Sequence, residues 1–104
     1  MSPENSDQDS LCTFCNLELI YEILKYIRSH CESLNGQIYT RIPYAQIPSI
    51  FNTEVNNVKY HCELLAKDGC FDRHFDEILG EIVLENIALK AEIRFQYIRR
   101  ILGK

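Results

Sequence analysis

The most regular pattern of apolar residues begins after Asn16, whose short polar side chain suits the N-cap of a helix. From there, apolar side chains recur every three or four positions, which places them on one face of a helix. Lys25 and Arg28 fall on the opposite face, and Asn35-Gly36 is a pair that ends helices. The pattern predicts an amphipathic helix that continues to this pair. Its apolar face consists of Leu17, Ile20, Ile23, Leu24, Ile27, Cys31 and Leu34.

The pattern then changes to that of a strand followed by a short helix. β-Branched and aromatic residues between Gln37 and Ile42 predict a strand, which Pro43 ends. The short helix that should follow contains Pro48, and proline is tolerated only in the first turn of a helix. We therefore expect this helix either to start late or to have a distorted first turn.

A longer helix is predicted next, so that the two helices form a hairpin within residues 43–71. Asn52 and Thr53 provide the turn and the N-cap of this longer helix, which should end at Lys67-Asp68-Gly69. Its apolar residues recur at helical spacing and leave a polar face on the other side. The apolar face consists of Val55, Val58, Cys62 and Leu65.

A β-hairpin should follow the helical hairpin. Residues 70–76 carry Phe71, Arg73 and Phe75 at every second position, and residues 81–86 contain three apolar residues in succession. Gly80, in the loop between them, tolerates a positive φ. We predict two antiparallel strands.

The last predicted helix, from about residue 87 to residue 102, carries two apolar stripes roughly 150° apart. A surface helix needs only one stripe. We expect the second to bind a partner, most simply another copy of the chain in a two-fold homodimer. The alternative is that the first helix and the β-hairpin cover both stripes within one chain. The first stripe consists of Ala91, Phe95, Ile98 and Leu102, and the second of Leu89, Ile93, Tyr97 and Ile101.

The predicted order is helix, strand, helix, helix, strand, strand, helix, which makes the chain a mostly helical α+β domain. This order resembles the winged helix-turn-helix fold, and LLAKDGCFD resembles the exit of its recognition helix. The closing ENIALKAEIRFQYI is similar to the end of small winged-helix proteins of unknown function from bacteria and their phages, although Ala88-Leu89-Lys90-Ala91 replaces their Leu-Thr-x-x-Gly-like turn. The resemblance covers residues 16–102. It implies a winged helix-turn-helix with an extra C-terminal helix, which binds DNA in many relatives and only protein in others.

Length and charge narrow the functions that fit this fold. The 104 residues allow one domain, which we place at residues 16–104, after a flexible acidic tail at residues 1–15. Net charge is −4, but it is unevenly distributed. Residues 1–87 contain six Lys and Arg against fourteen Asp and Glu, whereas residues 88–104 contain five against one. The negative net charge weakens a prediction of DNA binding. The basic segment at residues 88–104 means that the net charge does not exclude it.

In a winged-helix protein the longer helix of the helical hairpin would enter the major groove of DNA. Asparagine can pair with adenine and lysine with guanine or phosphate, so this polar face could read DNA. Glu54 and Glu63 on the same helix would repel the DNA backbone, and the alternative is a solvated or protein-binding face. The predicted DNA-binding residues are Thr53, Asn56, Asn57, Lys59, Tyr60, Lys67 and Arg73.

Cysteine and histidine residues give only a weak indication of a metal site. Cys12 and Cys15 form a C-x-x-C pair, the spacing with which two thiolates bind one zinc ion. A lone pair is insufficient, and on an apolar helix face a free cysteine behaves as a small hydrophobe. We therefore predict no cofactor. The residues that could complete a zinc site are His30, Cys31, His61, Cys62, Cys70 and His74, none of which forms a second metal-binding motif.

Catalysis and membrane insertion are not expected. The chain has no phosphate-binding glycine loop and no recognisable catalytic triad. No apolar run reaches the ~20 residues of a membrane-spanning helix, and an odd number of cysteines favours reduced thiols in the cytoplasm. The sequence thus predicts a dimeric DNA-binding regulator, transcriptional or phage-type. The alternative is a protein–protein interaction module, an adaptor or an antagonist of another regulator, that does not bind DNA.

Overall fold

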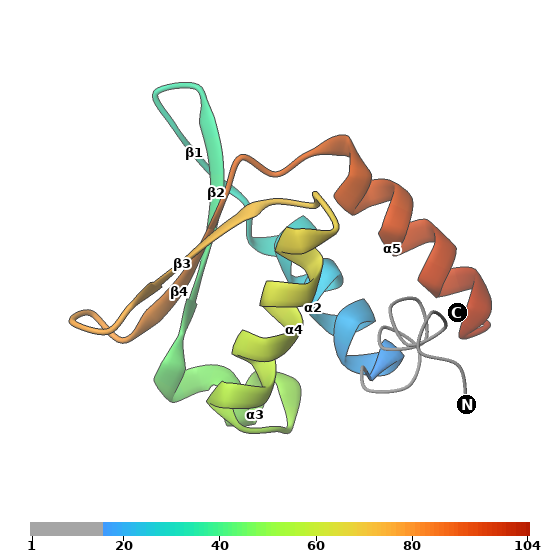
Figure 1. Ribbon diagram of the computed structural model, residues 1–104, viewed down its shortest axis with the longest axis horizontal. Helices are drawn as coiled ribbons and strands as arrows, with labels where there is room; N and C mark the ends of the chain where they lie inside the picture. Colours follow the sequence, from blue (N-terminus) through green and yellow to red (C-terminus); the bar gives the residue numbers. More distant parts are fainter. Residues whose placement is uncertain (1–15) are drawn as a thin grey trace, which may run out of the picture.

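An antiparallel sheet lies at one end of the molecule and helix α5 at the other, with the remaining helices between them (Figure 1). The computed structural model describes residues 16–104. The predicted acidic tail at residues 1–15 therefore lies outside the described residues. The elements are α2 (Leu17–His30), β1 (Glu32–Leu34), β2 (Gln37–Pro43), the 3₁₀ turn η1 (Tyr44–Gln46), α3 (Ile47–Phe51), α4 (Val55–Lys67), β3 (Asp72–Asp76), β4 (Glu81–Glu85) and α5 (Leu89–Ile101).

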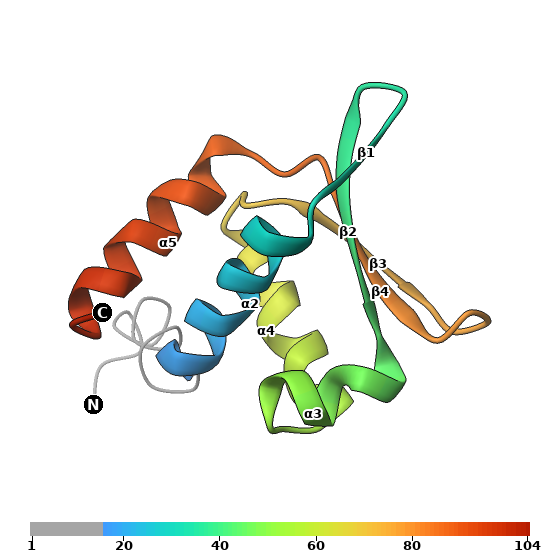
Figure 2. The ribbon, with the colours of Figure 1, turned by 180° about the vertical axis from the view of Figure 1, so that it is seen from behind.

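The sheet has four strands in the order β1-β2-β4-β3, and every neighbouring pair is antiparallel. Side chains alternate between its two faces. Thr40, Ile42, Ile82 and Leu84 are fully buried on the face toward the helices. The opposite face of the sheet, which we call the outer face, points away from the helices (Figure 2).

The core lies between the inner face of the sheet and the apolar faces of α2, α4 and α5. Helix α2 is central, since it contacts both α4 and α5. The rings of Tyr21 in α2 and Phe95 in α5 stack with their centroids 5.3 Å apart. Full burial of a side chain such as Ile23 or Val58 stabilises the fold by about 1.5–3 kcal/mol. The predicted mixed α+β class is confirmed.

The predicted first helix was too long at its C-terminal end. Asn16 is the N-cap as expected, and its Oδ1 accepts a hydrogen bond from the Leu19 backbone N–H (3.2 Å). The helix ends at His30, however, and Leu34 lies in strand β1 with 58% of its surface exposed. The reason is the pair Asn35-Gly36, whose φ angles of 54° and 81° suit a tight hairpin turn. This turn folds β1 back onto β2, a strand pair that the sequence pattern did not predict.

The helical hairpin confirms one prediction and corrects another. Helix α3 starts late, after the 3₁₀ turn, so that Pro48 falls in its first turn. Thr53 was predicted to be the N-cap of α4, but Glu54 has that position and makes no side-chain capping bond. Asn52 ends α3 with a left-handed φ of 57°, which delays the start of α4 by one residue.

The β-hairpin and the last helix are confirmed to within two residues. Strands β3 and β4 pair antiparallel, and Gly80 adopts a φ of 70° in the loop between them. Helix α5 runs from Leu89 to Ile101. None of the helices within residues 16–104 is long and apolar enough to cross a membrane.

Candidate interaction surfaces

The polar face of α4 carries most of the residues predicted to bind DNA. Asn56, Tyr60, Glu63 and Lys67 follow one another along the side opposite the buried residues of this helix. The face borders the β3–β4 hairpin, because α4 also packs against β3. Helix and hairpin therefore form one continuous surface.

Two of the three predicted DNA-binding cations on this surface are already paired with carboxylates. The Arg73 guanidinium binds Glu63 through two hydrogen bonds of 2.6 Å and 3.0 Å. Lys59 Nζ lies 2.9 Å from Glu77 Oε2 in the hairpin loop. These hydrogen bonds from Arg73 and Lys59 hold the pKa values of Glu63 and Glu77 below the usual range, so both carboxylates stay charged at neutral pH. The surface thus neutralises its own cations.

Of the other residues predicted to bind DNA, some already make side-chain hydrogen bonds within the chain and some do not. The Asn57 side-chain amide donates to Thr53 Oγ1 (2.9 Å), which occupies both residues. Asn56, Tyr60 and Lys67 are exposed, and no ion pair or side-chain hydrogen bond within residues 16–104 engages them. The structure therefore leaves three of the seven predicted side chains free to contact another molecule.

Helix α5 buries its first apolar stripe and exposes its second. Ala91, Phe95 and Ile98 pack into the core. The alternative that α2 and the β-hairpin cover both stripes is wrong, because neither element reaches the far side of α5. The exposed fractions of the second stripe are 76% for Leu89, 60% for Ile93, 51% for Tyr97 and 52% for Ile101.

Cations border this exposed stripe. Lys90, Arg94 and Arg100 surround Ile93 and Tyr97 in a shallow hollow of about 290 Å³. Asp68, at the end of α4, is the only carboxylate of the described residues that pairs with these cations. It lies 2.7 Å from Arg94 and 3.4 Å from Lys90. The outer face of α5 is therefore apolar and positively charged.

A groove between α2, α4 and α5 continues the apolar surface of the stripe. Its volume is about 200 Å³, and Tyr97 and Ile101 belong to both the stripe and the groove. Leu17 and Leu64 form its opposite wall. The exposed apolar surface of this end of the molecule is thus wider than one helix face.

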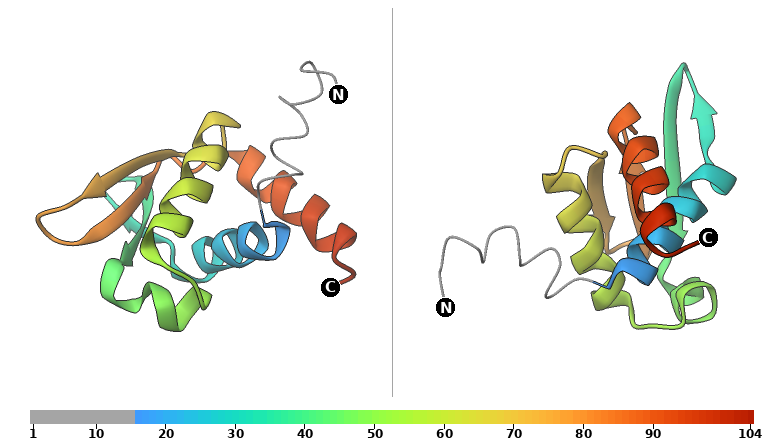
Figure 3. Two further views of the ribbon diagram at one scale, coloured as in Figure 1. Left: turned by 60° about the horizontal axis from the view of Figure 1, so that its bottom comes forward. Right: turned by 90° about the vertical axis from the view of Figure 1, so that its right-hand side faces the viewer.

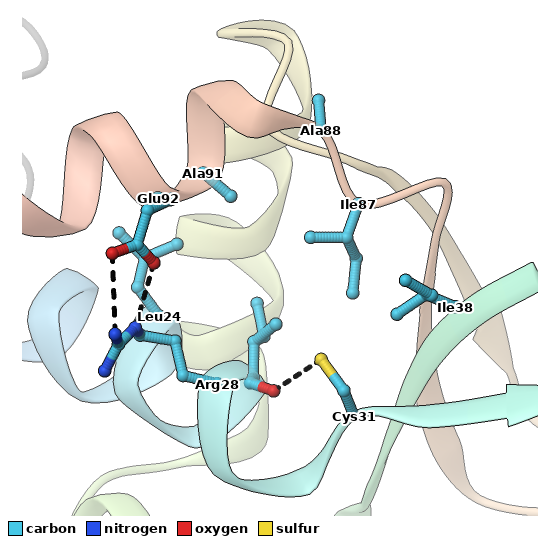
Figure 4. Close-up of a pocket in the computed structure, with 9 residues that line it drawn as sticks. Leu24, Arg28, Cys31, Ile38, Ile87, Ala88, Ala91 and Glu92 are labelled. Carbon is cyan, nitrogen blue, oxygen red and sulfur yellow. Dashed lines mark hydrogen bonds and ion pairs between the residues drawn. The ribbon is translucent and has the colours of Figure 1, made fainter.

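A second hollow, of about 180 Å³, lies where the end of α2 meets the starts of β2 and α5 (Figure 4). The ion pair between Arg28 and Glu92 (2.9 Å) forms one side. Cys31 Sγ donates to the Ile27 carbonyl (2.8 Å), and Ile38 lies near the start of β2. The lining is mainly apolar, and apart from the ion pair its one reactive group is the Cys31 thiol.

Sequence reasoning missed the outer face of the sheet. Asp72 lies directly opposite Glu85, and Asp76 lies directly opposite Glu81. Glu32 joins them from β1, where its carboxylate accepts a hydrogen bond from the Tyr39 hydroxyl (3.2 Å). The alternating acidic positions of β3 and β4 were the available signal, but only the strand register shows that they face one another.

The histidine and cysteine residues have structural roles or are apart from one another. The buried ring of His61 accepts a hydrogen bond from the Asn16 N–H (2.9 Å) and bonds the Asn57 carbonyl (2.7 Å), which joins α2 to α4. Burial raises the pKa of the Cys62 thiol to about 12. Cys31, which was predicted to lie on the apolar face of the first helix, is exposed because α2 ends before it.

No group of three or more metal-ligating side chains occurs within residues 16–104. The candidate zinc ligands Cys12 and Cys15 lie outside the described residues. Comparisons with protein-family models, with curated proteins and with solved structures found no match for this chain. Its function must therefore be inferred from its own surfaces.

Proposed function

We propose that the protein acts through protein–protein contact, and that the exposed stripe of α5 binds a second copy of the chain. The observation that carries this proposal is the row formed by Leu89, Ile93, Tyr97 and Ile101, each more than half exposed. Apolar surface removed from water contributes about 25 cal/mol per Å². A contiguous apolar patch of this kind marks an interaction site on a soluble protein.

We further propose that the fold is a winged helix-turn-helix, with α3 and α4 as the helical hairpin and β3–β4 as the wing. The order of elements and the sheet order β2-β4-β3 support this assignment. The face of α4 would then be a docking surface for another protein. Its paired charges, Arg73 with Glu63 and Lys59 with Glu77, support a protein partner more than the polyanionic backbone of DNA. A cytoplasmic location is part of the proposal, supported by the free described thiols of Cys31, Cys62 and Cys70.

Sedimentation velocity of the purified chain tests self-association directly. The chain should exceed the monomer mass at micromolar concentration, and Ile93→Lys should reduce it to a monomer, because a charge would replace apolar contact. Ile50→Lys is the matched control, since Ile50 is an exposed isoleucine on a different helix, α3. A monomeric parent chain, or an unchanged mass for Ile93→Lys, would contradict the proposal.

DNA binding is the second candidate function. It is favoured by Asn56, Tyr60 and Lys67, which lie in a row on the exposed face of α4. Binding to random short duplexes at low salt should then weaken steeply as salt rises, and Lys67→Ala should reduce the salt slope by about one. If no duplex is retained at low salt, this candidate is excluded.

A further inference from the structure

We infer that the exposed stripe of α5 docks on the outer face of the sheet of a second copy, so that a helix of one chain meets the sheet of the next. This inference rests on the proposed self-association through α5 and adds the surface that receives the helix. It depends on three features of the described residues. These are the unpaired carboxylates of the sheet, the shape of its outer face, and the cations beside the stripe.

The carboxylates on the outer face of the sheet lack cationic partners. Elsewhere Glu63, Asp68 and Glu92 each lie within 3 Å of a basic side chain. On the outer face, no ion pair within residues 16–104 engages any carboxylate, and the guanidinium of Arg41 lies over the Tyr39 ring. Asp72 and Asp76 accept hydrogen bonds only from neutral groups, the Asn86 amide and two backbone N–H groups of the hairpin loop. The carboxylates without an ion pair are Glu32, Asp72, Asp76, Glu81 and Glu85.

Two pairs of these carboxylates also repel one another. Asp72 and Glu85 are directly opposite across β3 and β4, as are Asp76 and Glu81. Like charges at directly opposed positions destabilise an antiparallel pair of strands. A cation placed between them would remove this repulsion, so the outer face gains more from a basic partner than separate carboxylates would.

The same face carries a hollow with both apolar and charged side chains in its lining. The volume of the hollow is about 300 Å³, and Tyr39, Val83, Arg41, Glu81 and Glu85 belong to its lining. Leu34 and Leu79 lie at its margins, near the tips of the two β-hairpins. Apolar side chains of a docked helix could therefore be buried here while its cations reach the carboxylates of β4.

The outer face of α5 has the complementary composition. Ile93 and Tyr97 would pack against Tyr39 and Val83 in the hollow of the sheet. Lys90 and Arg94 share one carboxylate, Asp68, so together they retain a positive charge. Arg100 makes no ion pair with another described residue. The helix thus offers apolar and positively charged groups where the sheet offers apolar and negatively charged groups.

Charge also argues against packing α5 on α5. A two-fold contact between stripes would bring Lys90, Arg94 and Arg100 of one copy close to the same residues of the other, and like-charge contacts oppose association. Contact between two outer sheet faces would oppose carboxylates in the same way. Only the contact between helix and sheet pairs opposite charges.

The positions of the two surfaces determine the kind of assembly. The sheet and α5 lie at opposite ends of the molecule, as both ribbon views and the first view of Figure 3 show. A contact between different surfaces is heterologous and repeats from one copy to the next. The assembly should therefore grow head to tail with concentration and should not stop at a closed dimer.

The test is sedimentation velocity of Glu81→Lys/Glu85→Lys. These substitutions place lysine opposite Asp76 and Asp72, so the strands should pair at least as well as before. The association constant should fall at least about tenfold, because lysines would face the cations of α5. Adding Lys90→Glu/Arg100→Glu should restore association by exchanging both charges. Glu22→Lys/Glu54→Lys, which changes charge equally on α2 and before α4, should leave association unchanged.

The salt dependence of association also distinguishes a helix–sheet contact from a helix–helix contact, because the two should respond to salt in opposite directions. Screening should weaken a contact between opposite charges and strengthen one between two α5 helices. If Ile93→Lys abolishes association while Glu81→Lys/Glu85→Lys leaves it intact, or if added salt strengthens association, the sheet is not the receiving surface and the self-association proposal survives. A mass that stops at the dimer would also overturn the head-to-tail contact. If Ile93→Lys has no effect, the proposed function itself fails.

Discussion

Helices α4 and α5 have the same length of 13 residues and each buries one face, but their outer faces differ. The outer face of α4 is polar, and ion pairs with the β3–β4 hairpin compensate Lys59 and Glu63. The outer face of α5 is apolar, and a single carboxylate offsets two of its cations. The paired charges of α4 leave it little net attraction for a polyanion, whereas α5 has both exposed apolar area and unpaired positive charge.

This comparison changes which helix carries the functional proposal. Sequence pattern alone pointed to α4, because polar residues on the second helix of a helical hairpin are typical of DNA readers. Two ion pairs, Arg73 with Glu63 and Lys59 with Glu77, join α4 to the hairpin that follows it. They reduce its positive charge where a DNA backbone would need it most.

The largest expected effect is on the free energy of unfolding, at a buried position of α4 compared with an exposed position of α5. Leu65→Ala in α4 should lower the free energy of unfolding by about 2–5 kcal/mol, because Leu65 is almost fully buried. Ile93→Ala in α5 should change it by no more than about 0.5 kcal/mol. Urea denaturation at sub-micromolar protein concentration measures both changes in unfolding free energy without a contribution from association. A cost above about 1.5 kcal/mol for Ile93→Ala would mean that the stripe packs within the chain.

A smaller effect is expected at the hydrogen bond that joins α4 to the start of α2. His61→Leu leaves the Asn16 N–H without its acceptor, at a cost of about 1–3 kcal/mol. His74, on the outer face of β3, is the control, and His74→Leu should be within about 0.5 kcal/mol of the parent chain. Chemical denaturation at neutral pH compares the two variants. Equal stability of both would show that this hydrogen bond is not needed.

The smallest effect concerns the ion pair between α4 and the hairpin. The hydrogen bond from Arg73 lowers the pKa of Glu63 in the folded chain. The pair therefore stabilises the fold above the unfolded pKa of Glu63, and this contribution is lost as the pH falls through the folded pKa. Glu63→Gln should make the decline of stability below about pH 4.5 shallower, which denaturation curves at several pH values would detect. An unchanged acid slope would show that solvent screens the pair completely.

Features fixed by local chemistry were predictable from the sequence. The N-cap at Asn16, the late start of α3 at Pro48 and the positive φ of Gly80 each depend on one residue and its neighbours. Strand β1 was not predictable from spacing, because Cys31 and Leu34 continue the helical pattern of α2. Only the left-handed turn that follows decides against the helix.

The surfaces were harder to predict than the elements. The stripe on α5 could be identified because helical spacing alone defines it. Arg73 and Glu63 are ten positions apart, and Asp72 and Glu85 meet only through strand register. Whether a charged side chain is free or paired therefore depends on contacts that no local pattern contains.

The opposed carboxylates of β3 and β4 also have a consequence for motion. Repulsion between Asp72 and Glu85, and between Asp76 and Glu81, opposes closure of this hairpin, so its strands should open more often than the rest of the sheet. Added salt screens the repulsion. Backbone amides of β3 and β4 should then exchange their hydrogens more slowly as ionic strength rises, while those of α2 keep the same rate. The rigidity of the hairpin would thus depend on the ionic strength of its surroundings.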